Sequence, residues 1–181
     1  VGGPHHFCGV PVRAMNGHLL SILLFLPLAG LIPLLLIPSD QKRSLKLCAN
    51  AVMLAGFLLS LLLVFQFDAA AAGYQFTENA PWIPSIGASY NVGIDGISLL
   101  LVMLTTLIGF LATMSSWSAV EDRLKEYYAL FLILQTGMLG VFVSLDFFPV
   151  YIFWEAMLVP MYFIIGAWGG PRKIYAPVKF F

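Results

Sequence analysis

One carboxylate, Glu155, lies inside a long apolar segment, eight residues after that segment begins at Phe147. At 1.5 Å per residue, Glu155 is about 12 Å from the end of a helix built from this segment, within the hydrocarbon of a bilayer. An ionised side chain at this depth costs about 2.5–3.5 kcal/mol or more, so it should face protein or water and have a partner. The position predicts a proton-relay carboxylate. The alternative is a protonated glutamic acid that only hydrogen-bonds between helices.

Three residues of the same segment are candidates to support Glu155. Tyr151 and Tyr162 share its helical face, so either hydroxyl could hydrogen-bond to the carboxylate, although packing is an alternative role for both. Pro160 lacks an N–H, and its ring clashes with the carbonyl of Ala156, beside Glu155. Such a break indicates either a hydrated pocket near the carboxylate or a purely structural kink.

The preceding apolar segment contributes two further polar candidates, Gln135 and Thr136. They could line a path for water towards Glu155. Single polar residues also hold membrane helices together, particularly beside small residues such as Gly137 and Gly140. Both interpretations stay open at this point.

Other kinds of chemistry have no matching motif. The chain has no glycine-rich phosphate loop and no cysteine cluster for iron and sulfur, so we expect it to bind no cofactor. His5, His6 and Cys8 form one isolated group without a second spaced cluster, and we expect no metal site. We therefore expect no redox or catalytic centre in this chain.

The composition indicates a membrane protein. Hydrophobic residues make up 60% of the chain and charged residues 10%, and the mean hydropathy is +0.92. A soluble domain has about 25% charged residues, so a water-soluble fold is excluded. Five apolar runs are long enough to cross the bilayer, which predicts an all-α, polytopic transmembrane helix bundle. The predicted spans are residues 19–38, 45–67, 97–117, 127–145 and 147–168.

The basic residues predict the orientation, because short loops rich in Lys and Arg stay inside the cell. Eight of the nine basic residues follow the first, third and fifth spans. They are Lys42, Arg43, Lys46, Arg123, Lys125, Arg172, Lys173 and Lys179. We therefore place the amino terminus outside, together with the links at residues 68–96 and 146.

The long outer link and the first residues have separate predictions. Residues 76–77 and 90–92 could form short strands of an outer β-hairpin, and Asp95 is placed to cap the third span. Residues 1–14 do not resemble a signal peptide. We expect them to be a disordered or mis-annotated leader, with the membrane domain covering residues 15–181.

Two runs of residues carry a family resemblance. They are GIDGISLLLVMLTTLIGF (93–110) and SLDFFPVYIFWEAMLVPMYFIIGAWGGPRKIYAPVKFF (144–181), of which FWEAMLVPMYFIIGAWGG is the more specific. From about Met15 onward, the chain resembles the M subunits of bacterial NADH-quinone oxidoreductase (respiratory complex I), the counterparts of mitochondrial subunit 4. The family is related to large subunits of cation/proton antiporters and contains two inverted repeats with broken helices.

The resemblance implies a role in the respiratory chain, as a subunit that couples electron transfer from NADH to quinone to proton translocation. It implies that Glu155 is the proton-channel carboxylate of the fifth helix, paired with a lysine on a later helix. NADH, flavin, iron-sulfur clusters and quinone would be bound by other subunits, and neighbouring antiporter-like subunits would be partners in the bacterial inner membrane. The chain looks like an amino-terminal fragment that should not pump alone. Pro177 replaces an expected small helix former.

Two alternatives stay open. The chain could belong to a multi-subunit sodium/proton antiporter or a membrane-bound hydrogenase, which share antiporter-like helices. It could instead be a non-catalytic membrane scaffold, in which case replacing Glu155 would leave function intact.

Overall fold

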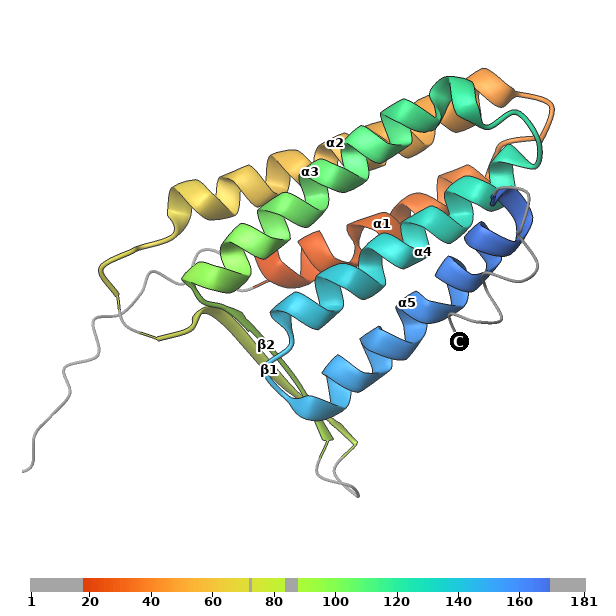
Figure 1. Cartoon of the computed structure of the whole chain (residues 1–181). Coiled ribbons are helices and arrows are strands. Elements are labelled where there is room, and N and C mark those ends of the chain that lie inside the picture. The colour runs from red at the N-terminus through yellow and green to blue at the C-terminus, as the bar shows by residue number, and fades with distance from the viewer. Residues whose placement is uncertain (1–17, 72, 84–87, 170–181) are drawn as a thin grey trace, which may run out of the picture.

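The computed structural model describes residues 18–71, 73–83 and 88–169, which contain five long helices and a two-stranded sheet (Figure 1). All five helices are long and apolar enough to cross a membrane. They are α1 (Leu19–Leu36), α2 (Lys42–Gln66), α3 (Gly96–Ala119), α4 (Leu124–Val143) and α5 (Phe147–Trp168). The predicted all-α membrane bundle is confirmed. The leader, His5, His6, Cys8, Arg172, Lys173, Pro177 and Lys179 lie outside the described residues.

The helices form three layers, which Figure 1 shows as the pair α2 and α3, the pair α1 and α4, and α5. Helix α4 is central and packs against α5, α1 and α3. In its most apolar 18-residue window, half of α4 is buried within the chain, compared with 6% of α5. Helix α5 therefore has one covered face and a wide face open to whatever surrounds the bundle.

The helix ends differ from the predicted spans by a few residues. Helix α1 ends at Leu36, because Ile37 precedes a proline and takes an extended conformation. Helix α2 begins at Lys42 instead of residue 45, because a helix can continue beyond the hydrocarbon into charged residues. Helix α4 begins at Leu124 instead of residue 127, directly after Arg123 in a left-handed conformation.

Polar side chains connect helices by hydrogen bonds, both within a layer and between layers. The Ser60 hydroxyl of α2 lies 2.8 Å from the Thr106 hydroxyl of α3. The Ser116 hydroxyl of α3 lies 2.8 Å from the Tyr127 hydroxyl of α4. These pairs act as contacts between helices, a common role for single polar residues in membranes.

A β-hairpin covers one end of the bundle. Strand β1 (Gln75–Ile83) pairs antiparallel with β2 (Ala88–Ile94), so both predicted strands exist but are longer than expected. Val92 and Ile94 are fully buried against the helices. Asp95 caps α3 as predicted, with its carboxylate accepting a 2.7 Å bond from the Ser98 N–H.

The hairpin is also bonded to the link between α4 and α5. The Leu145 N–H donates to the Asn91 carbonyl at 2.9 Å, and the Ser89 hydroxyl donates to the Asp146 carboxylate at 2.5 Å. The Trp82 ring meets the Phe148 ring edge-on, with centroids 6.0 Å apart. These contacts fix the start of α5 relative to the hairpin.

Candidate functional site

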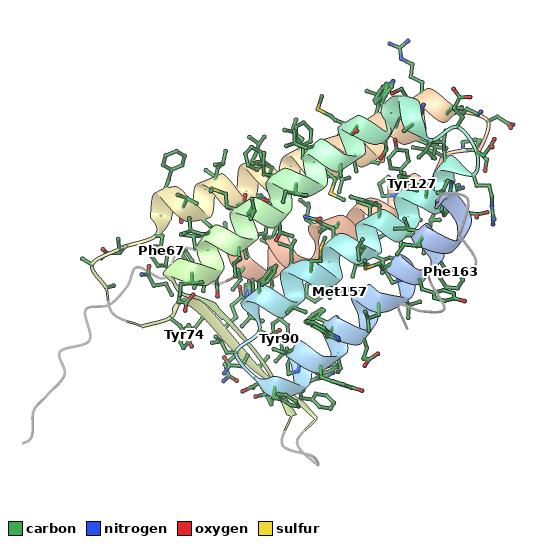
Figure 2. The ribbon with its side chains drawn as sticks, in the orientation of Figure 1. Phe67, Tyr74, Tyr90, Tyr127, Met157 and Phe163 are labelled. Carbon is green, nitrogen blue, oxygen red and sulfur yellow. The ribbon has the colours of Figure 1, made fainter. Side chains whose placement is uncertain are left out.

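The position of Glu155 follows from the way α5 packs on α4. A Cβ added at Gly137 would lie 2.7 Å from the Met157 Cβ, and one added at Gly140 would collide with the Phe153 ring. Figure 2 shows Met157 between the two helices. Two glycines of α4 therefore receive two large side chains of α5, and this contact sets the rotation of α5 about its axis.

The Glu155 carboxylate points away from this contact. It is two residues from both Phe153 and Met157, which places it about 160° around the helix from each of them. Its side chain is exposed, and within the described residues no hydrogen bond or ion pair involves its carboxylate. The acid lies near the middle of a membrane-length helix, facing the side that the described chain leaves uncovered.

The two tyrosines on the Glu155 face do not satisfy the carboxylate in this structure. Tyr151 is 55% exposed. Tyr162 is half-buried, with its ring edge-on to Phe163 at 5.6 Å between centroids. No hydrogen bond joins either hydroxyl to Glu155 among the described residues. Their supporting role stays a prediction.

Pro160 lies within α5 without ending it. The helix continues to Trp168, two turns further on, and Pro160 itself is buried. Proline removes the N–H that would bond to the Ala156 carbonyl, next to Glu155. A locally weakened backbone beside the carboxylate is therefore retained in a continuous helix, while the predicted water pocket stays a prediction.

Gln135 points towards α3, not towards Glu155. Its side-chain amide donates to the Thr105 carbonyl at 3.1 Å, and a Cβ added at Gly109 would lie 2.5 Å from its Oε1. That Oε1 is buried and has no hydrogen-bond partner in the described structure. Thr136 is also buried, and it donates to the Leu132 carbonyl of its own helix at 3.2 Å. These contacts match the alternative in which both residues serve helix packing.

Sequence reasoning missed a second carboxylate, Glu78 on β1. Its side chain is 10% exposed, and it accepts bonds from the Ser21 N–H at 3.1 Å and the Ser21 hydroxyl at 2.5 Å. His18 Nδ1 lies 3.5 Å from the same carboxylate. Because His18 gives α1 no side-chain cap, Glu78 caps α1 from a distant part of the chain. No local pattern marks such a contact.

Tyr90 on β2 completes this cluster. Its hydroxyl lies 2.9 Å from the Ser21 hydroxyl, and Figure 2 shows Tyr90 at the end of the bundle where the hairpin meets the helices. Burial raises the pKa of Tyr90, and the nearby Glu78 carboxylate adds to this effect, while the hydrogen bond with Ser21 opposes it. The Tyr90 hydroxyl therefore stays protonated at neutral pH. Together with Glu78 and Ser21, it connects the hairpin to the start of α1 by hydrogen bonds.

These features define a class of protein. Five membrane-length helices, an end-capping hairpin and a mid-helix carboxylate on the open face of α5 make the described part of the chain a polytopic membrane protein. In the part of the chain that the structure describes, no three His, Cys, Asp or Glu side chains come together to hold a metal ion.

The chain belongs to the family of NADH-ubiquinone oxidoreductase chain 4, whose amino-terminal model matches residues 20–145. It is 47% identical over 168 residues to subunit M of NADH-quinone oxidoreductase from Rhodobacter capsulatus, with 91% of this chain and 32% of that protein covered. The chain therefore spans about a third of the length of the curated relatives that it matches.

Solved structures share the fold. A chain of respiratory complex I from Thermus thermophilus with bound NADH matches with a TM-score of 0.73 and 26% identity, covering 89% of this chain and 32% of that one. A chain of the Mrp complex from Dietzia matches with a TM-score of 0.72 and 18% identity, covering 88% of this chain and 17% of that one. The second match supports the fold alone. In sequence and fold, the chain is therefore similar to part of a membrane subunit of respiratory complex I.

Proposed function

We propose that this chain belongs to a proton-translocating subunit of NADH-quinone oxidoreductase and that Glu155 takes up and releases the proton. One observation carries the proposal. Glu155 lies mid-helix on the face of α5 opposite to its contact with α4, with no partner among the described residues. An ionised carboxylate in that position has a high free energy unless water or a group outside the described residues solvates it or pairs with it.

The missing partner would be a cation on a helix that covers the open face of α5. With the cation close, the charged form of a carboxylate is favoured, and with the cation withdrawn the protonated form is favoured. A movable neighbour therefore converts Glu155 between proton acceptor and proton donor. The family resemblance makes a lysine the candidate for this cation.

The redox chemistry would take place in other subunits. The complex would bind NADH, flavin, iron-sulfur clusters and quinone elsewhere, and neighbouring antiporter-like subunits would be the direct partners of this chain. We place it in the bacterial inner membrane with its amino terminus outside. Lys42 and Arg43 at the start of α2, with Arg123 and Lys125 at the start of α4, support this orientation, because they lie at the same end of the bundle.

Two other functions remain as competitors. An antiporter or hydrogenase subunit would share the fold, but the likeness to the Mrp complex is at 18% identity, against 47% for subunit M of Rhodobacter capsulatus. A non-catalytic scaffold would have no need of an acid at the middle of α5. Both competitors make different predictions for the same substitution.

The test replaces Glu155 by Gln in the full-length subunit within the intact complex. Proton uptake into inverted membrane vesicles and NADH oxidation are measured together. We expect normal assembly with both activities reduced at least tenfold, because the amide cannot ionise. The matched control is Glu121→Gln, which removes an exposed carboxylate from the loop between α3 and α4 and should leave both activities unchanged.

Each result has a clear meaning. Normal pumping and turnover in the Glu155→Gln complex would show that the acid is structural and would remove the proposal. Sodium transport is measured in the same vesicles, and its loss with NADH-driven proton pumping retained would favour the antiporter alternative. Equal losses in the Glu121→Gln complex would show that the effect is not specific to the site.

A further inference from the structure

A basic pocket lies where α2 begins and α3 ends, away from Glu155. It has a volume of about 470 Å³ and is lined by Lys42, Arg43, Lys46 and Trp117. Lys42 and Arg43 are exposed, and in the described structure none of the three cations forms an ion pair. The Lys46 ammonium donates to the Trp117 carbonyl at 2.5 Å and lies 5.9 Å from the centre of its ring. The pocket therefore presents three positive charges and no carboxylate.

An apolar groove continues from this pocket along the outer face of α2 and α3. It has a volume of about 420 Å³, and Trp117 lines both the pocket and the groove. Leu47 and Met114 in its lining are 52% and 53% exposed. From Lys46 the groove reaches Leu54, about 12 Å deeper along the helix. Its walls run from the charged end of the bundle into the hydrocarbon layer.

We propose that the pocket and the groove together bind one anionic glycerophospholipid such as phosphatidylglycerol. The phosphate would lie among Lys42, Arg43 and Lys46, with Trp117 at the level of the glycerol, where indole rings are favoured. One acyl chain would fill the groove between α2 and α3. Basic side chains at the end of a transmembrane helix pair are recognised binding positions for anionic headgroups.

The continuity of the two surfaces selects this ligand. A free phosphate ion would use the basic pocket and leave the groove unfilled. A protein partner would need carboxylates at one end and an apolar face along the groove. A phospholipid carries both parts in the right order, with a fixed charge at the interface and a chain directed into the membrane.

The test uses the intact complex in phosphatidylcholine nanodiscs that contain a small amount of phosphatidylglycerol with a diazirine in one acyl chain. After illumination, labelled peptides are mapped by mass spectrometry. We expect label on α2 near Leu47–Leu54 and on α3 near Phe110–Trp117. Arg43→Gln should weaken the labelling about fivefold, the effect of one basic residue near a headgroup, and Arg43→Lys should restore it. Ala51→Phe should fill the groove and remove the label.

The matched control is Arg123→Gln, which removes one arginine from the same end of the bundle outside this pocket. Its labelling should equal that of the unchanged complex. Equal labelling by a phosphatidylcholine probe would show bulk lipid and would overturn the proposal. No label in the groove would show that protein covers it. If inorganic phosphate suppressed the labelling while Ala51→Phe had no effect on it, the pocket would be an ion site. Either result would refute the lipid assignment.

Discussion

Replacing Gly137 by Ala tests the contact that orients Glu155. The added Cβ would lie 2.7 Å from the Met157 Cβ and 3.1 Å from the Met157 backbone N and Cα. Carbon atoms in good contact are at least about 3.5 Å apart, so α5 must retreat by about 0.8 Å at this point. A change of rotamer cannot relieve the clash, because two of the three neighbouring atoms belong to the backbone.

The size of the effect follows from two opposing terms. Overpacking of this kind costs about 1–3 kcal/mol. The gain in helix propensity from Gly to Ala is up to about 1 kcal/mol and offsets part of it. We therefore expect the free energy of unfolding to fall by up to about 2 kcal/mol. Under the proposed function we also expect weaker NADH-driven pumping, because displacement of α5 would move Glu155 relative to its proposed cationic partner.

The assay compares the thermal unfolding of the full-length subunit in detergent with pumping by the assembled complex. The matched control is Gly56→Ala in α2, where the added Cβ would meet only Leu26 Cδ2 at an ordinary 3.7 Å. That variant should be up to about 1 kcal/mol more stable. If Gly137→Ala is as stable as Gly56→Ala, then α4 and α5 are not in close contact and the orientation of Glu155 must be reconsidered.

Two further predictions concern polar contacts. A double-mutant cycle with Ser60→Ala and Thr106→Ala should give a coupling of about 0.6 kcal/mol in unfolding experiments, and no coupling would mean that this bond adds nothing. The Ser98 N–H holds the pKa of Asp95 below its ordinary value of 3.8. The Asp95 carboxylate therefore stabilises the fold at pH values above its pKa in the unfolded chain. This stabilisation is lost as the pH falls through its lower pKa in the folded chain. The Asp95→Asn variant keeps a capping side chain that does not titrate. Between neutral pH and about pH 3, its melting temperature should therefore fall less than that of the unchanged protein, and equal falls in the two proteins would contradict this.

Much of the fold could be predicted because hydrocarbon leaves few choices. A segment of about 20 apolar residues must satisfy its backbone internally, and so hydropathy alone located all five helices to within a few residues. The ends of the helices were predicted less accurately, because they lie outside the hydrocarbon, where water and charged side chains can satisfy the backbone. The α2 helix continues to Lys42 for this reason. The hairpin is longer than predicted, and its Val92 and Ile94 are buried by distant helices, a contact that no local pattern encodes.

The candidate site could be predicted only in part. The depth of Glu155 follows from counting residues, but its direction depends on which face of α5 meets α4. Helix α5 is apolar nearly all round, so its sequence carries no amphipathic signal of a buried face. The contact of Phe153 and Met157 with two glycines decides that direction. Gln135 was predicted to lie near Glu155 because both residues lie near the middle of their helices. Its side chain instead fills the space beside Gly109 on α3.

The packing also indicates which part of a proton relay would move. Helix α5 is fixed along one face by α4 and at its start by the hairpin contacts at Leu145, Asp146 and Phe148. A carboxylate on so constrained a helix has a well-defined position, as a site for repeated proton transfer requires. Under the proposed function, its protonation state would then be changed by a group that approaches from the open side. We infer that Glu155 is the stationary member of the relay and that its cationic partner is the member that moves.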